Sequence, residues 1–290
     1  MILETRGKHV ATVNRDILCP YLNRYHNYFN RQKRGENVRL LSNVQEDYKR
    51  VIAVKAAEVL NLESWTEVEI GEGDIGDRAI KAVQRNRNLI GRFQVSGFAD
   101  KVKEDVFVSE RLLYNLYHDR KDQECFDRSC GLFGRKYDLI AYLYFIMDSS
   151  MYLPLRPSIF DGIFRKLGIS LKTVGRCSWE NYQEFLATVA EVRDVMKDYY
   201  QTDDVDLLDA HSFLWTLNLK DFNNVSDSSD SMEVAAKEAN YQFDEGVYHK
   251  GYGKGTVVKL ETDKVYVDFN GKQRIFSYPE AFEKEYLKRL

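Results

Sequence analysis

The chain has 290 residues, of which 44% are hydrophobic, so it is long enough to bury a sizeable core in one large domain or two smaller ones. Its 42 basic and 45 acidic residues give a net charge of −3, which excludes a global field that draws the chain to nucleic acid or to a membrane. With 4 Pro and 17 Gly, the composition excludes collagen-like and low-complexity chains and favours long helices.

Targeting and redox signals indicate a cytoplasmic protein. No apolar run approaches the roughly 18 residues that span a bilayer, and the first residues lack the hydrophobic stretch of a signal peptide. The four cysteines are too few and too scattered for a disulfide framework. We therefore expect reduced thiols and no membrane partner.

Residues 1–218 are predicted to form a helical body. Apolar side chains recur at helical spacing in residues 44–60 and 179–196, and Ser178 is placed to cap the second of these helices. Residues 137–147 are apolar nearly all round, which predicts a buried helix. Strand signals are sparse here, so the body is expected to be mainly α.

Residues 219–243 are polar and turn-prone and are predicted to be a linker, and residues 244–290 change to a β pattern. Asn270-Gly271 predicts a type I′ hairpin turn between two of three to five short strands. Pro279 is placed to open a terminal helix that runs to Leu290. The residues expected inside this small sheet or barrel are Val257 or Val258, Val265, Val267, Phe269 and Ile275.

The C-terminal segment resembles a known module. Its motifs are Tyr252-Gly253-Lys254-Gly255-Thr256-Val257, then residues 265–269, then Arg274-Ile275-Phe276 before a closing helix. This pattern is similar to the SH3-like, Tudor-type module at the C-terminus of UvrD/PcrA-type DNA helicases. The resemblance implies an SH3-like β-barrel that docks on nucleic acid or on a protein partner. Residues 278–282 depart from the helicase ending.

The body also carries familiar sequences, at residues 152–157, 177–182 and 207–215. These are similar to uncharacterised bacterial proteins and to helical regions of restriction and phage-defence proteins. The resemblance implies a setting in defence or DNA metabolism and implies no particular reaction.

Gly71-Glu72-Gly73-Asp74-Ile75-Gly76 matches the Gly-x-Gly-x-x-Gly pattern of dinucleotide-binding loops. Glu72 and Asp74 would lie beside an anionic pyrophosphate, and one short strand at residues 67–70 without a βαβ repeat provides no sheet. We therefore interpret the motif as a turn that starts a helix, expected from Asp77, and we expect no cofactor.

Cys125 and Cys130, with His118 and the distant Cys177, supply enough groups for a zinc site. The spacing is wide for structural zinc and no Cys-x-x-Cys pair is present, so buried thiols are the favoured interpretation and no metal is expected.

Asp209, His211 and Ser212 carry the groups of a hydrolase triad. On one helix, however, successive residues point about 100° apart, so these three cannot converge. His211 is expected to be a hydrogen-bonded core histidine. Motifs of nucleases and of phosphate-binding loops were not found, which argues against a stand-alone nuclease or NTPase.

Two sets of cations in the body are candidate anion contacts. The first set lies in a segment where cations interleave with aromatic rings. This pattern fits nucleic-acid binding and a core-facing helix stripe equally well. The cations are Arg24, Arg31, Lys33 and Arg34, and the rings are Tyr21, Tyr25, Tyr28 and Phe29. The second is Arg156, held between Pro154 and Pro157, for which pairing with Asp148 or Asp161 is favoured over a ligand contact.

The sequence thus predicts a non-enzymatic accessory or adaptor protein with a mainly α body and a small β module. In the module the candidate binding residues are Tyr252, Lys254, Lys272 and Arg274, on a basic edge shared with Lys250 and Lys259. Nine basic and eight acidic residues in 244–290 are too balanced for tight phosphate binding, which favours a protein partner over DNA. The alternative is an enzyme acting on nucleic acid or nucleotide, with a site around Arg156, Glu180 and His211.

Overall fold

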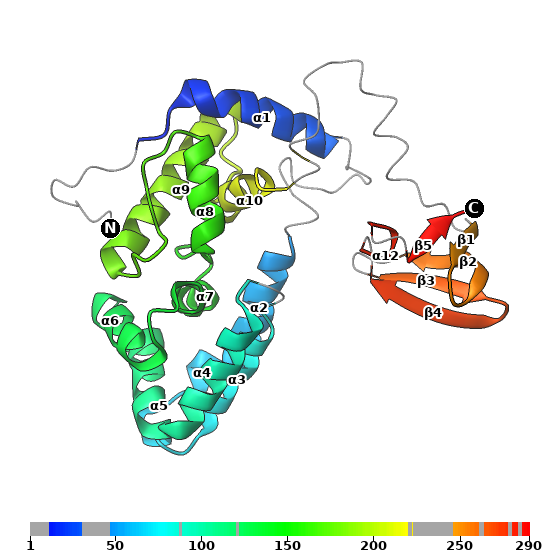
Figure 1. Ribbon diagram of the computed structural model, residues 1–290. Helices are drawn as coiled ribbons and strands as arrows, with labels where there is room; N and C mark the ends of the chain where they lie inside the picture. The colour runs from blue at the N-terminus through cyan, green and yellow to red at the C-terminus, as the bar shows by residue number, and fades with distance from the viewer. Residues whose placement is uncertain are drawn as a thin grey trace. The chain divides into compact units, whose positions relative to one another are not determined.

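The computed structural model describes residues 12–30, 47–86, 89–119, 122–219, 222, 246–260, 264–277, 280–283 and 286–290. It divides into two compact units, Met1–Val225 and Ser226–Leu290. The first is a helical body and the second, here called the module, is a small antiparallel sheet (Figure 1). The combination of a helical body with a small β unit confirms the predicted class. The linker predicted at residues 219–243 lies almost entirely outside the described residues.

The described residues of the body carry helices, as predicted, and no strand. Short 3-10 segments lie at Leu62–Ser64 (η1) and Glu67–Glu69 (η2), so the strand considered for residues 67–70 is absent. A π-helical turn at Asn115–Asp119 (η3) extends α5. The α-helices are α1 (Arg15–Asn30), α2 (Tyr48–Leu60), α3 (Asp74–Gln84), α4 (Arg92–Glu104), α5 (Val106–Tyr114), α6 (Asp122–Phe133), α7 (Tyr137–Met147), α8 (Pro157–Lys166), α9 (Trp179–Tyr200) and α10 (Leu207–Thr216).

Helix α7 is the centre of the body (Figure 1). It packs on α2, α3 and α6, and α9 reaches it through rings, with the centroids of Tyr144 and Tyr182 5.9 Å apart. Leu139–Ile146 is buried without a break, as its apolar sequence predicts. The hydroxyls of Tyr142, Tyr144 and Tyr182 donate to backbone carbonyls, as Tyr182 does to Leu153 at 2.7 Å, so these buried hydroxyls are satisfied.

Local capping explains where several helices begin. The Ser178 side chain accepts a hydrogen bond from the Asn181 backbone N–H at 3.2 Å, which confirms the predicted cap of α9. Asp206 and Asp209 form a reciprocal capping box at the start of α10. Pro157 opens α8, a position where its missing N–H costs nothing.

The module is a five-stranded antiparallel sheet with strand order β4-β3-β2-β1-β5. Asn270 and Gly271 have φ angles of 54° and 84°, as the predicted type I′ turn requires. The elements are β1 (Gly246–His249), β2 (Gly253–Leu260), β3 (Lys264–Phe269), β4 (Lys272–Ser277), α12 (Glu280–Glu283) and β5 (Leu287–Arg289).

The sheet curls into a half-barrel. The rings of His249 on β1 and Phe276 on β4 lie 5.3 Å apart, although a flat sheet would separate these strands by three spacings of about 4.8 Å. The concave face buries Val257, Val265, Val267 and Phe269, as predicted, together with Val247, Ala281 and Leu287. Gly255 is required beneath this face, because a Cβ there would lie 2.6 Å from the Phe269 ring.

Two predictions for the module were wrong. Ile275 is 58% exposed, because β4 pairs Val265 with Phe276 and Tyr266 with Ile275, which turns Phe276 inward and Ile275 outward. The terminal helix is short: α12 ends at Glu283, and Leu287–Arg289 forms β5, which pairs with β1. A helix through Leu290 would leave that edge of β1 without its hydrogen bonds.

Within the residues that the structure describes, no helix is both long enough and apolar enough to cross a bilayer.

Candidate functional site

The predicted cationic segment of α1 is largely core-facing where it is described. Tyr25 is fully buried, and its ring makes an edge contact with Phe213 at 5.0 Å. The guanidinium of Arg24 lies over the Phe222 ring, 5.9 Å from its centroid. These contacts are those of a helix stripe packed on the body. Arg31, Lys33 and Arg34 lie outside the described residues.

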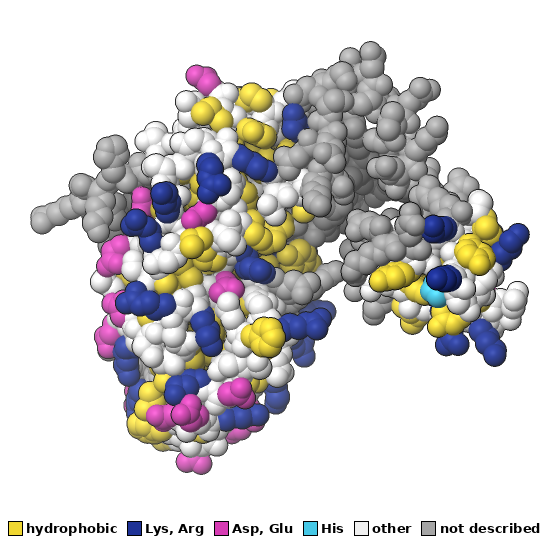
Figure 2. All heavy atoms as spheres, viewed as in Figure 1, with side chains coloured by type: hydrophobic (Ala, Val, Ile, Leu, Met, Phe, Trp, Pro, Cys, Tyr) yellow, Lys and Arg dark blue, Asp and Glu magenta, His cyan; other side chains and the backbone are white. Residues whose placement is uncertain are grey.

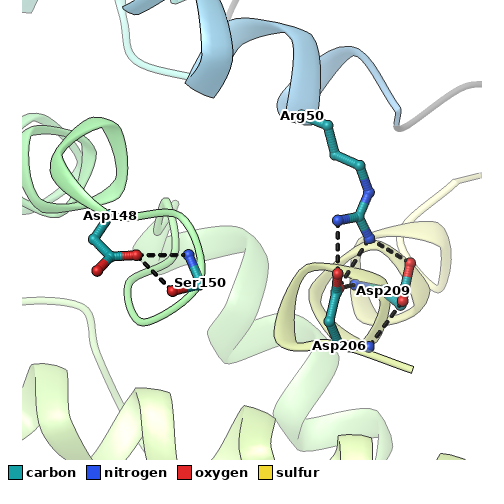
Figure 3. Close-up of polar contacts among 5 residues, drawn as sticks. All are labelled: Arg50, Asp148, Ser150, Asp206 and Asp209. Atoms are coloured by element: carbon teal, nitrogen blue, oxygen red, sulfur yellow. Dashed lines mark hydrogen bonds and ion pairs between the residues drawn. The ribbon is translucent and has the colours of Figure 1, made fainter. Parts of the chain in front are cut away.

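Arg156 is half-buried and serves as the N-cap residue of α8. Asp161, one of the carboxylates considered as its partner, accepts hydrogen bonds from the backbone N–H and the hydroxyl of Thr173, both at 2.7 Å. Asp148, the other, accepts from the backbone N–H and the hydroxyl of Ser150 (Figure 3). Asp148 therefore fixes a local turn, and Asp161 holds the chain at Thr173 against α8.

His211 is buried and hydrogen-bonded, as predicted. Its Nε2 lies 2.8 Å from the Pro154 carbonyl and its Nδ1 3.1 Å from the Lys49 ammonium. A carbonyl only accepts and an ammonium only donates, so the neutral ring carries its proton on Nε2. Burial lowers the pKa of His211 well below its ordinary value, and the Lys49 charge lowers it further.

Lys49 was missed by the sequence analysis. It has no exposed surface, and its ammonium lies 5.2 Å from the centroid of the Trp215 ring in addition to its hydrogen bond with His211. The next residue, Arg50, reaches the capping box of α10: it contacts Asp206 at 2.7 and 2.9 Å and Asp209 at 2.6 Å (Figure 3). Together these residues fasten α2 to α10, a structural role that needs no substrate.

The glycine-rich loop at Gly71–Gly76 does hold an anion, and the anion is the protein's own Glu110. The buried carboxylate of Glu110 accepts hydrogen bonds from the backbone N–H groups of Gly71 at 2.6 Å, Gly73 at 3.3 Å and Gly76 at 2.7 Å. The loop opens α3 at Asp74, three residues before the predicted start at Asp77. Because Glu110 fills the position that a phosphate would take, the loop is a structural joint between α3 and α5.

Two of the cysteines considered for a metal site, Cys130 and Cys177, lie side by side. The Sγ atoms of Cys130 and Cys177 lie 3.6 Å apart, and Cys125 is buried separately on α6. Across the described residues, no three His, Cys, Asp or Glu side chains are grouped closely enough to hold a metal ion.

The module carries a cluster of four rings that reaches the surface at Tyr252. Tyr252, in the β1–β2 turn, is 48% exposed and stacks on His249, with centroids 4.5 Å apart and planes 22° apart. Phe269 and Phe276 lie 5.4 and 6.3 Å from the Tyr252 centroid and link the cluster to the core. The guanidinium of Arg274 lies over the Tyr252 ring at 5.3 Å.

Strand register separates the predicted binding residues between the two faces of the sheet, since directly paired residues share a face. Lys272 pairs with Phe269 and Arg274 pairs with Val267, so both belong to the concave side with Tyr252. Lys254 pairs with Tyr248, which lies one residue from the buried Val247 and faces the convex side. We call the exposed and partly exposed residues of the concave side the concave rim; it consists of His249, Tyr252, Lys272, Arg274 and Phe276.

The predicted basic edge is therefore not one continuous surface. On the convex face, Tyr248 pairs with Lys254 on one side and with Lys288 on the other. Arg274 and Lys272 lie on the concave rim. The side chain of Lys259 is outside the described part of the chain. Figure 2 shows Lys and Arg side chains beside hydrophobic ones on the visible face of the module, with no described acidic side chain among them.

The residues of the predicted enzymatic alternative do not line the best-formed hollows of the described part of the body. The two best-formed hollows in the described part of the chain are open depressions of about 320 and 370 Å³, near Lys55 and Asn86 respectively. Neither is lined by Arg156, Glu180 or His211. Glu180 instead lies at the surface and accepts a hydrogen bond from Gln123 at 3.2 Å.

Comparison of this chain with protein-family models, with curated proteins and with solved structures finds no significant match.

Sequence reasoning named Tyr252, Lys272 and Arg274 as binding residues and did not include His249 and Phe276, which the structure places beside them. A signal for His249 was present, since it alternates with the apolar Val247 on a strand. No local signal marked Glu110 or Lys49, whose partners lie far away in the sequence.

Proposed function

We propose that this chain is an accessory protein of bacterial DNA metabolism or anti-phage defence, which docks on a protein partner through the concave rim of its C-terminal module. The observation that carries the proposal is the half-exposed Tyr252 ring, stacked on His249 and covered by the Arg274 guanidinium. The SH3-like assignment of the module and the setting in DNA metabolism or defence are supported by the sequence resemblance alone.

The chemistry of the concave rim fits a protein partner. Tyr and Arg are enriched at the energetic centres of protein interfaces, because they combine a large rigid contact area with directional hydrogen bonding. Here the rings of Tyr252 and Phe276 would pack on an apolar or aromatic side chain of the partner, and Arg274 with Lys272 would bind a carboxylate beside it. The expected partner segment is therefore acidic and contains an apolar anchor.

Binding to DNA is less well supported. Tight phosphate binding requires many cations along one path, and each contact adds to the salt dependence of the affinity. The strand register places Lys254 on the face opposite Lys272 and Arg274, which leaves few aligned phosphate contacts. Tyr252 is 48% exposed and could still contact a base, so DNA is the competing outcome of the experiment.

The test is capture of partners by the immobilised full-length chain from the lysate of cells that produce it, with and without nuclease treatment. Tyr252→Ala and Arg274→Gln are expected to abolish capture of the partner. The matched controls are Tyr248→Ala and Lys254→Gln on the convex face, where Tyr248 is 43% exposed, and they are expected to retain it.

Survival of the captured protein after nuclease treatment, with loss only in the two concave variants, supports the proposal. Equal loss in the convex variants would refute the concave rim as the docking surface. Micromolar binding of a labelled single-stranded DNA at physiological salt, lost with Tyr252→Ala, would show that the partner is nucleic acid.

A further inference from the structure

Two cysteines from distant parts of the body meet in the fold. Cys130 lies in the last turn of α6, and Cys177 immediately precedes Ser178, the cap of α9. Their Sγ atoms are 3.6 Å apart although 47 positions separate them in the sequence. A disulfide has an S–S bond of about 2.05 Å, so the two sulfurs need to approach by only about 1.5 Å.

The two thiols have different environments. Cys130 is partly exposed and Cys177 is buried, so a small oxidant reaches Cys130 first. Arg135 lies at the surface beside the pair, where its Nη1 donates to the Cys177 carbonyl at 3.1 Å. This hydrogen bond holds a permanent positive charge close to both sulfurs.

The two environments shift the pKa values of the two thiols in opposite directions. The hydrogen bond with Cys177 lowers the pKa of Cys130, and the Arg135 charge lowers it further, against burial and the opposing carboxylate of Asp127. The same hydrogen bond raises the pKa of Cys177, and burial and Asp138 raise it further, while Arg135 opposes them. Of the two thiols, Cys130 is therefore the one that gives up its proton first.

The other described cysteine of α6 is a natural internal comparison. Cys125 is five positions before Cys130, which turns it about 140° away around the helix. It is buried, and burial raises its pKa to about 11. It lacks both properties that make Cys130 reactive, partial exposure and a lowered pKa.

We propose that Cys130 and Cys177 are a peroxide-sensitive dithiol, in which Cys130 is oxidised first and Cys177 then closes a disulfide. In the first step the Cys130 thiolate attacks one oxygen of hydrogen peroxide. An S–O bond forms, the O–O bond breaks, and the hydroxide that leaves takes up a proton to become water. In the second step Cys177 gives up its proton and attacks the Cys130 sulfur, an S–S bond forms, the S–O bond breaks, and a second hydroxide leaves as water.

The disulfide would tie the end of α6 to the start of α9 and close a loop that contains α7 and α8. A cross-link of this kind stabilises the body mainly by restricting its unfolded state. Reduction by a dithiol reverses it.

The test treats the full-length chain with a small excess of hydrogen peroxide, blocks free thiols with iodoacetamide, and maps tryptic peptides without reduction. Trypsin separates the relevant cysteines: residues 129–135 hold Cys130, residues 177–193 hold Cys177, and residues 122–128 hold Cys125. The expected product is the cross-linked pair 129–135 and 177–193, lighter by two hydrogen atoms and restored to separate peptides by dithiothreitol.

Variants separate the two steps. Cys177→Ser is expected to stop at the sulfenic acid of Cys130, which dimedone traps, and Cys130→Ser is expected to leave Cys177 reduced. Arg135→Gln should slow the alkylation of Cys130 at neutral pH and move its rate–pH profile to higher pH, with recovery in Arg135→Lys. Cys125→Ser should change none of these results.

A disulfide that involves Cys125 or Cys19 in the folded chain would overturn the proposal. So would Cys130 and Cys177 that both remain open to alkylation after peroxide treatment, provided that circular dichroism shows the chain to be folded.

Discussion

Replacing Glu110 by Gln tests whether its carboxylate holds the loop at Gly71–Gly76. One carboxylate oxygen accepts from Gly76 and the other from Gly71 and Gly73. Glutamine keeps the shape but has one accepting oxygen, and its NH₂ group then faces at least one backbone N–H. A buried donor without an acceptor costs about 1–3 kcal/mol, and the bonds that remain lose about 1 kcal/mol of charge assistance. The expected destabilisation is about 2–4 kcal/mol.

The assay is thermal and urea unfolding of the full-length chain, followed by circular dichroism of the helical body. For a body of this size, about 2–4 °C is lost per kcal/mol, so the midpoint should fall by about 5–15 °C. Glu124→Gln is the matched control, because Glu124 is exposed and its contact with Arg128 at 3.6 Å is a surface ion pair worth less than about 0.5 kcal/mol. An equal, small effect of both substitutions would refute the role assigned to Glu110.

Three further predictions concern pH and the hairpin. Burial opposes the ionisation of Asp206, but Arg50 outweighs it and brings the pKa of Asp206 to about 2. In the unfolded chain the pKa of an aspartate is about 3.9. The loss of stability caused by Arg50→Gln, measured by urea unfolding, should therefore be greatest above about pH 4 and should disappear as the pH falls toward 2. The lowered pKa of His211 keeps the folded ring neutral where the unfolded ring, with a pKa of about 6.5, already binds a proton. Stability should therefore fall by up to about 1.4 kcal/mol per pH unit as the pH drops below about 6.5, and the His211 ring resonance should titrate at lower pH than that of an exposed histidine. Gly271→Val should lower the stability of the module by about 1–3 kcal/mol, because valine is strained at φ 84°, and Gly271→Asn should be tolerated. Amide chemical shifts of β3 and β4 that do not change in the valine variant would contradict the assigned turn.

Local patterns predicted the elements that local forces determine. The Ser178 cap and an unbroken apolar run placed α9 and α7, because capping and helical burial depend on neighbours within a few residues. Asn270-Gly271 predicted its hairpin for the same reason. Ile275 was placed on the wrong face, since the face of β4 depends on its register with β3 and not on its own residues.

The candidate site was only partly predictable because its contacts join distant residues. Tyr252 and Arg274 stood out as an aromatic and a cation in a small β unit, but the ring of His249 reaches Phe276 only through the curl of the sheet. Glu110 accepts from an N–H 34 positions away, and Lys49 meets His211 across 162 positions. No periodicity in the sequence records such contacts, so the filled anion site and the buried lysine emerged only from the folded chain.

The burial of α7 on every side has a consequence for synthesis on the ribosome. Residues 137–147 leave the exit tunnel after α2, α3 and α6, which cover part of the helix, but before α9, whose Trp179 and Tyr182 rings complete its shelter. During that interval the apolar side chains of this helix are exposed and can contact other nascent chains. The order of elements along the chain thus creates a vulnerable period in biogenesis, in which chaperone binding to this segment would prevent aggregation.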